Sequence, residues 1–211
     1  MAALAKQLAA GRVELFAASE AVMDAASPAR TPAGVIALAD PPRAGLADVF
    51  ARQPALVVSM HFVQDPGNVG AIVRAAEAAG ATGVVAMAGC ADPFGWKALR
   101  GAMGSAFRLV VAHGVAWADL AGAARASGAR ILAAVPRGGD ELYRADLREP
   151  TVLLMGGEGA GLDDEMLAAA DGRVRIPMAA GIESLNVAVA AGVLLFEARR
   201  QRTAGPPGGQ A

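Results

Sequence analysis

The sequence contains a single cysteine, Cys90, and only 4% of its 211 residues are aromatic. One cysteine excludes an internal disulfide framework and a cysteine-based zinc site, so we expect no metal. Lysine is also scarce: the chain has two lysines, Lys6 and Lys97, and 17 arginines. The longest apolar run, Val187–Phe196, has ten residues, far fewer than the roughly 18 to 20 that span a bilayer. We therefore expect a cytoplasmic protein with no membrane partner.

The chain also lacks a strong charge of either sign. Its formal net charge is −1 and its pI is about 6.1, so overall electrostatics make no case for nucleic-acid binding. Arginine binds phosphate in a bidentate manner better than lysine does. A genomic bias toward arginine and alanine codons explains the same ratio, and charge therefore leaves the partner open.

From residue 55 onward the chain alternates short apolar runs with helical patterns. The apolar runs are continuous rather than alternating, which is typical of parallel strands covered on both faces. This pattern predicts an α/β fold with a parallel sheet flanked by helices. The expected strands are 55–60, 83–87, 107–112, 130–135, 151–156 and 173–178. The expected helices are 68–80, 96–103, 117–128, 164–170 and 184–202, the first with Asn68 as its N-cap and Gly80 at its end.

The first 50 residues have a different character. They contain one helical stretch, a short strand pattern over 34–39 and several prolines, too little to bury a core alone. We divide the chain into an N-terminal region (1–50), one main domain (54–202) and a flexible tail (203–211).

Three polar segments follow expected strands of the main domain, at the sheet edge where open α/β folds bind ligands. In the first segment, Pro66 and Gly67 predict a tight turn before the helix that carries Arg74. Arg74 lies among apolar residues, so it either extends from an apolar face or points into a polar site. His61 and His113 have no carboxylate or metal-ligand spacing around them, and we interpret both as structural.

The second segment, 153–167, is a glycine-rich turn between a strand and a helix, a shape that suits close approach to a ligand. It is neither a dinucleotide fingerprint nor a P-loop. It also places four acids, Glu158, Asp163, Asp164 and Glu165, where a phosphate would have to lie. The segment therefore favours a neutral or cationic cofactor over NAD or ATP.

The third segment, 176–186, joins a strand to the long apolar helix. Pro177 has no N–H, so the strand should end there. A serine at the helix start, Ser184, is explained by N-capping. Asn186 is not explained in that way, because an asparagine within the first turn of an apolar helix is costly without partners. The three segments together could form one site.

These segments resemble, in order and spacing, the three motifs of the SpoU (TrmH-type) RNA 2′-O-ribose methyltransferases of the SPOUT class. The first resembles D-P-x-N-x-G-x-x-x-R-x-A from Asp65, the second G-x-E-x-x-G-L from Gly156, and the third I-P-M…S-L-N-V-x-x-A from Ile176. Between the first two, residues 93–109 resemble the family's P-x-x-x-K-x-x-R-x-S-M-G-x-x-F-R-L segment. Ala102 there replaces the family's usual serine.

The resemblance implies an α/β knot, in which the C-terminal part of the chain forms a deep trefoil knot. It implies S-adenosylmethionine as cofactor, a homodimer, and an RNA substrate whose ribose 2′-hydroxyl is methylated. The cofactor-binding positions carried over are Gly156, Ile176, Met178 and Leu185. The catalytic positions are Arg74, Asn68, Glu158, Ser184 and Asn186. Arg74, Lys97 and Arg100 are the expected RNA-binding residues.

Arg74 has the central role in this reading, either as the base or as a clamp on the phosphate beside the target ribose. Arginine is effectively never deprotonated in proteins, so we give the clamp equal weight. The other catalytic positions would orient Arg74 and the ribose.

The N-terminal region resembles the end of the substrate-binding domain that rRNA-type members carry, with Pro32, Gly34, Val35 and Ala37 matching P-x-G-V-x-A. Ribosomal RNA is therefore favoured over tRNA as substrate. Two alternatives are a non-catalytic RNA-binding relative with the same fold and a Rossmann-type oxidoreductase. Retention of Arg74, Glu158, Ser184 and Asn186 argues against the first, and the acidic glycine loop argues against the second.

Overall fold

The computed structural model describes residues 7–8, 11, 13–28, 34–159 and 161–204. The chain divides into two compact units, Met1–Asp40 and Pro41–Ala211, and each is described here by itself. In the first unit, α2 (Glu20–Ala26) has Ser19 as its N-cap, whose hydroxyl accepts a hydrogen bond from the backbone N–H of Val22.

None of the residues of α2 is buried. The expected strand over 34–39 is wrong, because those residues form no strand. Pro32 of the N-terminal signature lies outside the described residues. The first unit therefore offers no apolar core of its own among its described residues.

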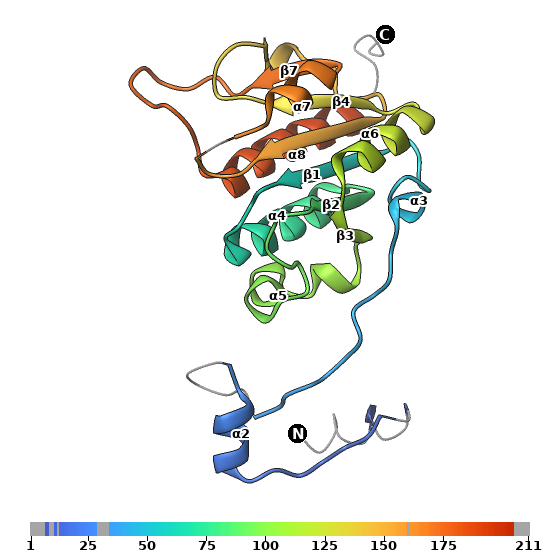
Figure 1. The fold of residues 1–211 in the computed structure, drawn as a ribbon, viewed down its shortest axis with the longest axis vertical. Helices are drawn as coiled ribbons and strands as arrows, with labels where there is room; N and C mark the ends of the chain where they lie inside the picture. Colours follow the sequence, from blue (N-terminus) through green and yellow to red (C-terminus); the bar gives the residue numbers. More distant parts are fainter. Residues whose placement is uncertain (1–6, 9–10, 12, 29–33, 160, 205–211) are drawn as a thin grey trace. The chain divides into compact units, whose positions relative to one another are not determined.

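The second unit is a parallel sheet covered by helices (Figure 1). No helix in its described part is long and apolar enough to cross a membrane. In chain order its elements are α3 (Leu46–Val49), β1 (Leu56–His61), α4 (Pro66–Ala79), β2 (Gly83–Met87), α5 (Trp96–Ala102), η1 (Ser105–Phe107), β3 (Val111–Val115), α6 (Trp117–Ala126), β4 (Arg130–Ala134), β5 (Asp140–Glu141), η2 (Leu142–Arg144), β6 (Thr151–Gly156), α7 (Asp164–Ala169), β7 (Gly172–Arg175) and α8 (Val187–Thr203).

The seven strands lie in the order β3-β2-β1-β6-β4-β7-β5, and every pairing is parallel. The predicted α/β fold with a parallel sheet is therefore confirmed. The central pair is β1 with β6, and its register places His61 beside Gly156. Two of the three polar segments thus leave the sheet side by side. The trefoil knot stays a prediction.

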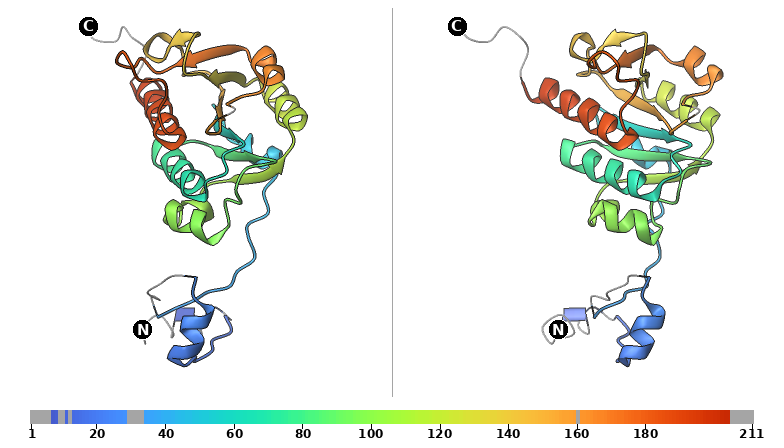
Figure 2. Two further views of the ribbon diagram at one scale, coloured as in Figure 1. Left: turned by 60° about the vertical axis from the view of Figure 1, so that its left-hand side comes forward. Right: turned by 90° about the vertical axis from the view of Figure 1, so that its left-hand side faces the viewer.

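Two helical layers cover the sheet (Figure 2). On one face α4, α5 and α8 pack over Leu56, Val58 and Met60 of β1. On the other face α3, α6 and α7 pack over Ala55 and Val57. Because successive strand side chains point to opposite faces, a strand buried on both faces has to be apolar throughout.

Helix α4 begins at Pro66, after Asp65, whose carboxylate accepts the backbone N–H of Asn68 at 2.9 Å. The expectation that Asn68 is the N-cap is therefore wrong, because Asp65 holds that position and Pro66 fills the first turn. The helix ends as expected at Gly80, where φ is 78°, a conformation that glycine adopts without steric cost.

Helices α4 and α5 approach each other closely. A Cβ atom at Gly70 would overlap the carbonyl oxygen of Ala98, so only glycine fits there. Beyond α5, Arg108 Nε and Nη2 donate to the Glu77 carboxylate of α4 at 2.6 and 2.8 Å. These hydrogen bonds lower the pKa of Glu77 to about 2. The α4–α5 layer is therefore fixed by both packing and charge.

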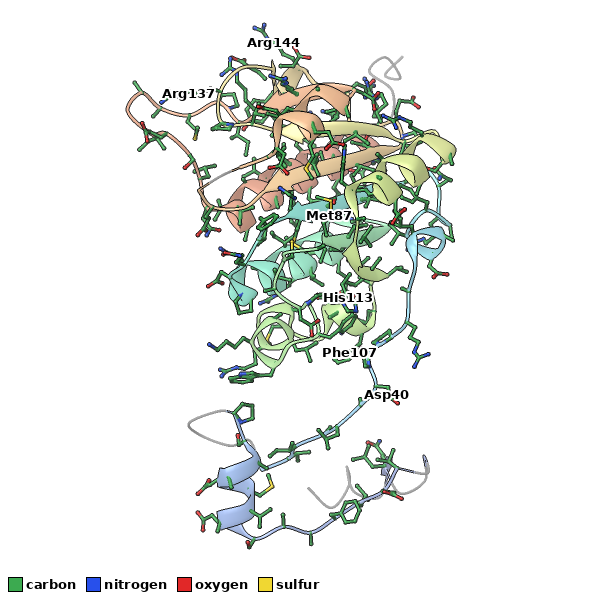
Figure 3. All side chains as sticks on the ribbon, viewed as in Figure 1. Asp40, Met87, Phe107, His113, Arg137 and Arg144 are labelled. Carbon is green, nitrogen blue, oxygen red and sulfur yellow. The ribbon has the colours of Figure 1, made fainter. Side chains whose placement is uncertain are left out.

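Some expected boundaries are wrong. The strand expected over 107–112 is β3, which begins only at Val111, because Phe107 belongs to the 3-10 helix η1 and His113 to the strand (Figure 3). The strand expected over 173–178 stops at Arg175. Helix α8 begins three residues later than expected, at Val187. The short elements α3 and β5 were not predicted.

Candidate active site

The three polar segments meet at one edge of the sheet. The first follows β1 and leads into α4, the second follows β6 and leads into α7, and the third joins β7 to α8. In a parallel sheet the carboxyl ends of the strands lie at the same edge. The prediction that these segments gather there is confirmed.

One residue from each segment forms a hydrogen-bonded polar cluster, which consists of Asn68, Glu158 and Asn186. Glu158 Oε1 accepts from Asn68 Nδ2 at 2.9 Å and from Asn186 Nδ2 at 3.1 Å. Asn186 Nδ2 also donates to Asn68 Oδ1 at 3.1 Å. Within the described residues the second carboxylate oxygen of Glu158 has no partner, so it is available to accept a proton or a hydrogen bond.

Asn186 has a second structural role, because it is the N-cap of α8. Its Oδ1 accepts from the backbone N–H groups of Ala188 at 3.0 Å and Val189 at 3.3 Å. The interpretation of Asn186 as a costly residue inside the helix is therefore wrong, and so is the assignment of the cap to Ser184. The amide oxygen caps the helix while the amide nitrogen serves the polar cluster.

A cavity of about 640 Å³ opens beside the polar cluster. All four positions expected to bind the cofactor line it: Gly156, Ile176, Met178 and Leu185. Glu158 and Ser184 line it as well. Further apolar walls come from Val135, Met155, Leu162, Leu167, Val174, Val187, Ala190 and Leu194.

The floor of the cavity requires glycine. A Cβ atom at Gly157 would overlap the carbonyl oxygen of Phe62, and one at Gly156 would lie 2.5 Å from the carbonyl carbon of Gly161. The backbone N–H of Gly157 donates to the His61 carbonyl at 2.7 Å. The glycines of the second segment therefore let its backbone lie directly against the end of β1.

The acids of the second segment do not all face the cavity. Of these four acids only Glu158 lines the cavity. The expectation that Asp163, Asp164 and Glu165 also lie at the ligand position is therefore wrong. Asp163 Oδ2 instead lies 3.1 Å from Nε2 of His61, which is buried. His61 therefore has a carboxylate partner that its sequence surroundings did not suggest, and its role remains structural.

Sequence reasoning missed one wall of the cavity, residues 134–137 after β4. Arg137 lies on this loop (Figure 3), and its Nη2 is 3.6 Å from Oε1 of Glu183, which also lines the cavity. Both side chains are largely exposed. The one feature of the sequence that could have indicated this wall is that the expected strand over 130–135 ends at the same sheet edge.

The expected RNA-binding side chains are exposed and separate from the cavity. Arg74 lies on α4, and within the described residues it makes no hydrogen bond or ion pair. Lys97 and Arg100 lie on α5, where the Arg100 guanidinium stands 5.1 Å from the ring centre of Trp96. In the part of the chain that the structure describes, no group of three histidine, cysteine, aspartate or glutamate residues could hold a metal ion.

Known proteins share this sequence pattern and fold. The model of the SpoU rRNA Methylase family matches residues 55–196. An uncharacterized tRNA/rRNA methyltransferase of Synechocystis sp. is 36% identical over 95% of this chain and 73% of its own length. The 23S rRNA (uridine(2479)-2′-O)-methyltransferase of Streptomyces viridochromogenes is 35% identical over 91% of this chain and 69% of its own.

Solved structures agree with the sequence comparison. The SpoU methyltransferase AviRb of Streptomyces viridochromogenes, in complex with the cofactor AdoMet, matches with a TM-score of 0.86 at 32% identity. The match covers 96% of this chain and 79% of that one.

Proposed function

The chain belongs to the SpoU rRNA methylase family, and we propose that it transfers a methyl group from S-adenosylmethionine to a ribose 2′-hydroxyl of RNA. The observation that carries this proposal is the polar cluster of Asn68, Glu158 and Asn186 beside a glycine-floored apolar cavity. Ribosomal RNA is the favoured substrate, because the Streptomyces relative acts on 23S rRNA.

The cavity suits S-adenosylmethionine in size and charge. Its volume of about 640 Å³ lies within the range of small-molecule sites. Ile176 and Leu185 provide apolar surface for an adenine ring, and the glycine backbone can approach a ribose closely. Arg137 and Glu183 carry the charges that complement a carboxylate and an ammonium group. When bound, the cofactor would supply an electrophilic methyl group.

The residues of the chain then have to position the ribose and remove a proton. A hydroxyl is a weak nucleophile, so its orientation and deprotonation limit the reaction. The free oxygen of Glu158 can accept a hydrogen bond from the hydroxyl, while Asn68 and Asn186 hold the carboxylate in place. We assign Ser184 a contact at the rim of the cavity and Arg74 a contact with the adjacent phosphate.

Isothermal titration with S-adenosylmethionine and with NAD tests the cofactor assignment. We expect saturable heat with the first and none with the second.

Leu185→Ala should lower the affinity for S-adenosylmethionine about tenfold, because the side chain lines the cavity and its truncation removes buried apolar area. Ile182→Ala is the matched control, since Ile182 lies in the same loop but outside the cavity lining. The absence of heat with S-adenosylmethionine would overturn the proposal.

Replacing Asn186 by serine separates its two roles. Serine keeps an oxygen that can cap α8, but it cannot donate to both Asn68 and Glu158. We expect the methyl-transfer rate to fall roughly 100-fold through misplacement of the carboxylate, with a melting temperature near that of the wild type. In Asn186→Ala the methyl-transfer rate should fall by the same factor, and the free energy of unfolding should also fall by about 1 kcal/mol. A serine variant with the wild-type rate would contradict the role of the polar cluster.

We further propose a cytoplasmic homodimer. Val189 and Phe196 are each about half exposed on α8, and with the half-buried Val193 they form an apolar stripe along one face. A second copy of the chain is the occupant that we assign to this stripe. Cytoplasmic localisation follows from the proposed ribosomal RNA substrate.

Residues 1–50 are, in our proposal, the end of an RNA-binding domain. The match to the Synechocystis relative covers 95% of the chain and therefore includes most of this region.

A further inference from the structure

Phe62 adopts a backbone conformation that is unusual for a large side chain. It directly follows β1, and its φ angle is +52°. A bulky residue in the left-handed region is a genuine outlier. Such strain is concentrated at functional sites, where the surrounding structure enforces it. Glycine or asparagine would adopt this conformation more easily.

The neighbouring backbone holds Phe62 in this conformation. Its carbonyl oxygen lies against Gly157, where a Cβ atom would overlap it. Its ring covers Gly89, where a Cβ atom would lie 3.0 Å from the Phe62 Cζ atom, and it meets the ring of His61 edge to face at 4.8 Å. The position of the ring is therefore well defined.

Phe62 nevertheless stays 50% exposed. A strained aromatic residue that contributed only to the core would be buried, because burial of apolar area is what stabilises such a side chain. The structure instead presents a flat apolar face to the outside, at a defined angle, next to the candidate active site.

Phe62 borders a second, smaller recess of about 150 Å³, which also involves Gln64, Asp65, Asn68 and Glu158. Glu158 lines both this recess and the larger cavity. An occupant of the recess would therefore contact Asn68 and Glu158 of the polar cluster from outside the proposed cofactor cavity. The recess is thus a place where a substrate could reach the polar cluster while the cofactor is bound.

We propose that the ring of Phe62 stacks on the base of the nucleotide that is methylated. The inference rests on the proposed function, since it places the target ribose between Phe62 and Glu158. Stacking on an aromatic side chain is a common means of holding an unpaired base. It accepts any base, because every base has a π face, so Phe62 would position the nucleotide without selecting its sequence.

Phe62→Asn tests this inference, because asparagine tolerates a positive φ but has no ring. The substrate is deproteinised ribosomal RNA from cells that lack the gene. We expect the KM for this RNA to rise roughly ten- to 100-fold, with a smaller change in kcat. The melting temperature should stay equal or rise, and the affinity for S-adenosylmethionine should stay within twofold of wild type. Phe62→Trp should retain the low KM.

Tyr143→Ala is the matched control, since Tyr143 is 63% exposed and lines neither cavity. An unchanged KM in Phe62→Asn would overturn the inference. A lower melting temperature would instead make the ring structural, and conversion of a dimer to a monomer, measured by light scattering, would make it an interface residue. Either result also overturns the inference. If the wild-type protein neither binds S-adenosylmethionine nor methylates RNA, it is the proposed function that fails.

Discussion

Arg74→Ala should lower the methyl-transfer rate by roughly 100- to 1000-fold, the loss typical of removing one charged or polar contact to a developing transition state. Arg74 is exposed on α4 and has no partner within the described residues. Its five N–H donors are therefore free to bind an RNA phosphate. Because Arg74 does not line the cavity, S-adenosylmethionine should bind with nearly unchanged affinity. A single-turnover assay and a calorimetric titration measure the two effects.

Arg74→Lys tests the assigned phosphate contact against the alternative role, in which Arg74 is the base. If Arg74 clamps a phosphate, lysine keeps the charge but loses the bidentate contact, and the rate should be intermediate and insensitive to pH. If Arg74 is the base, the lower pKa of lysine should make the rate rise steeply with pH. Arg125→Ala is the control, since Arg125 is similarly exposed on α6. Full activity in Arg74→Ala would contradict both roles.

The parallel sheet was predictable because its central strands leave a strong signal. The boundaries of β2 and β6 agree with the expected 83–87 and 151–156, since each is a continuous apolar run between turns. The edge strand β3 was misplaced, because the apolar run begins at Phe107, which is half exposed at the end of the 3-10 helix η1, whereas the strand begins only at Val111. An apolar run indicates burial more reliably than it indicates the type of element.

The three loops of the site were predictable, but their internal geometry was not. Serine and asparagine are equally good N-caps, so the sequence could not decide between Ser184 and Asn186. The side chain of Asn186 is held by Asn68 and Glu158. These partners lie far away in sequence, so their contribution could not be read from the local pattern. The positive φ of Phe62 likewise leaves no signal in the sequence, because glycine or asparagine would be expected there.

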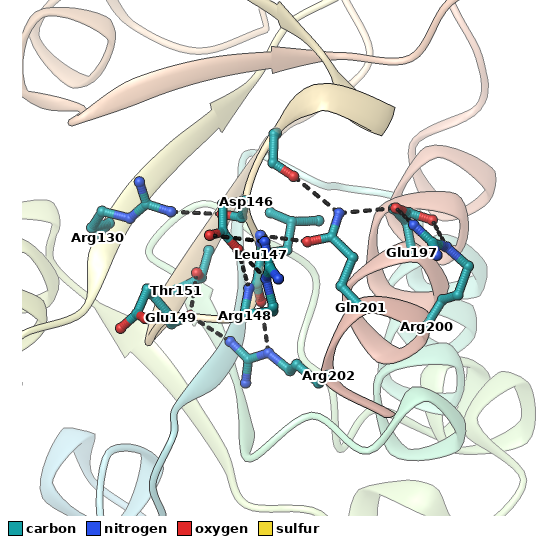
Figure 4. A network of polar contacts seen from close by, with 11 residues as sticks. Arg130, Asp146, Leu147, Arg148, Glu149, Thr151, Glu197, Arg200, Gln201 and Arg202 are labelled. Atoms are coloured by element: carbon teal, nitrogen blue, oxygen red, sulfur yellow. Dashed lines mark hydrogen bonds and ion pairs between the residues drawn. The ribbon is translucent and has the colours of Figure 1, made fainter. Parts of the chain in front are cut away.

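The C-terminal end of α8 depends on Arg202, the centre of a polar network (Figure 4). Its guanidinium donates to four backbone carbonyl groups at distances from 2.6 to 3.0 Å, those of Leu147, Glu149, Pro54 and Ala55. Burial lowers the pKa of Arg202, but the group stays charged at neutral pH. Arg202 therefore connects α8 to the start of β1 and to the segment that precedes β6.

Arg202→Met should destabilise the protein by about 3 kcal/mol, because methionine fills similar space but removes four hydrogen bonds. The carbonyl groups of Ala55 and Glu149 keep a donor in Thr151, whereas those of Pro54 and Leu147 lose theirs. For a domain of this size, this destabilisation corresponds to a decrease of roughly 6–12 °C in melting temperature, measurable by calorimetry. Arg199→Met is the control, since Arg199 is exposed one turn earlier on α8 and its guanidinium makes no hydrogen bond or ion pair within the described residues. Its melting temperature should stay within about 2 °C of wild type.

The activity of Arg202→Met separates stability from catalysis. Arg202 lies 16 residues after Asn186, which corresponds to about 24 Å along the helix axis. Well below its melting temperature, the variant should therefore transfer methyl groups at a rate close to that of wild type. A strong loss of rate at 20 °C would mean that the network at the end of α8 also sets the position of Asn186. A melting temperature equal to that of wild type would mean that water replaces the guanidinium without cost.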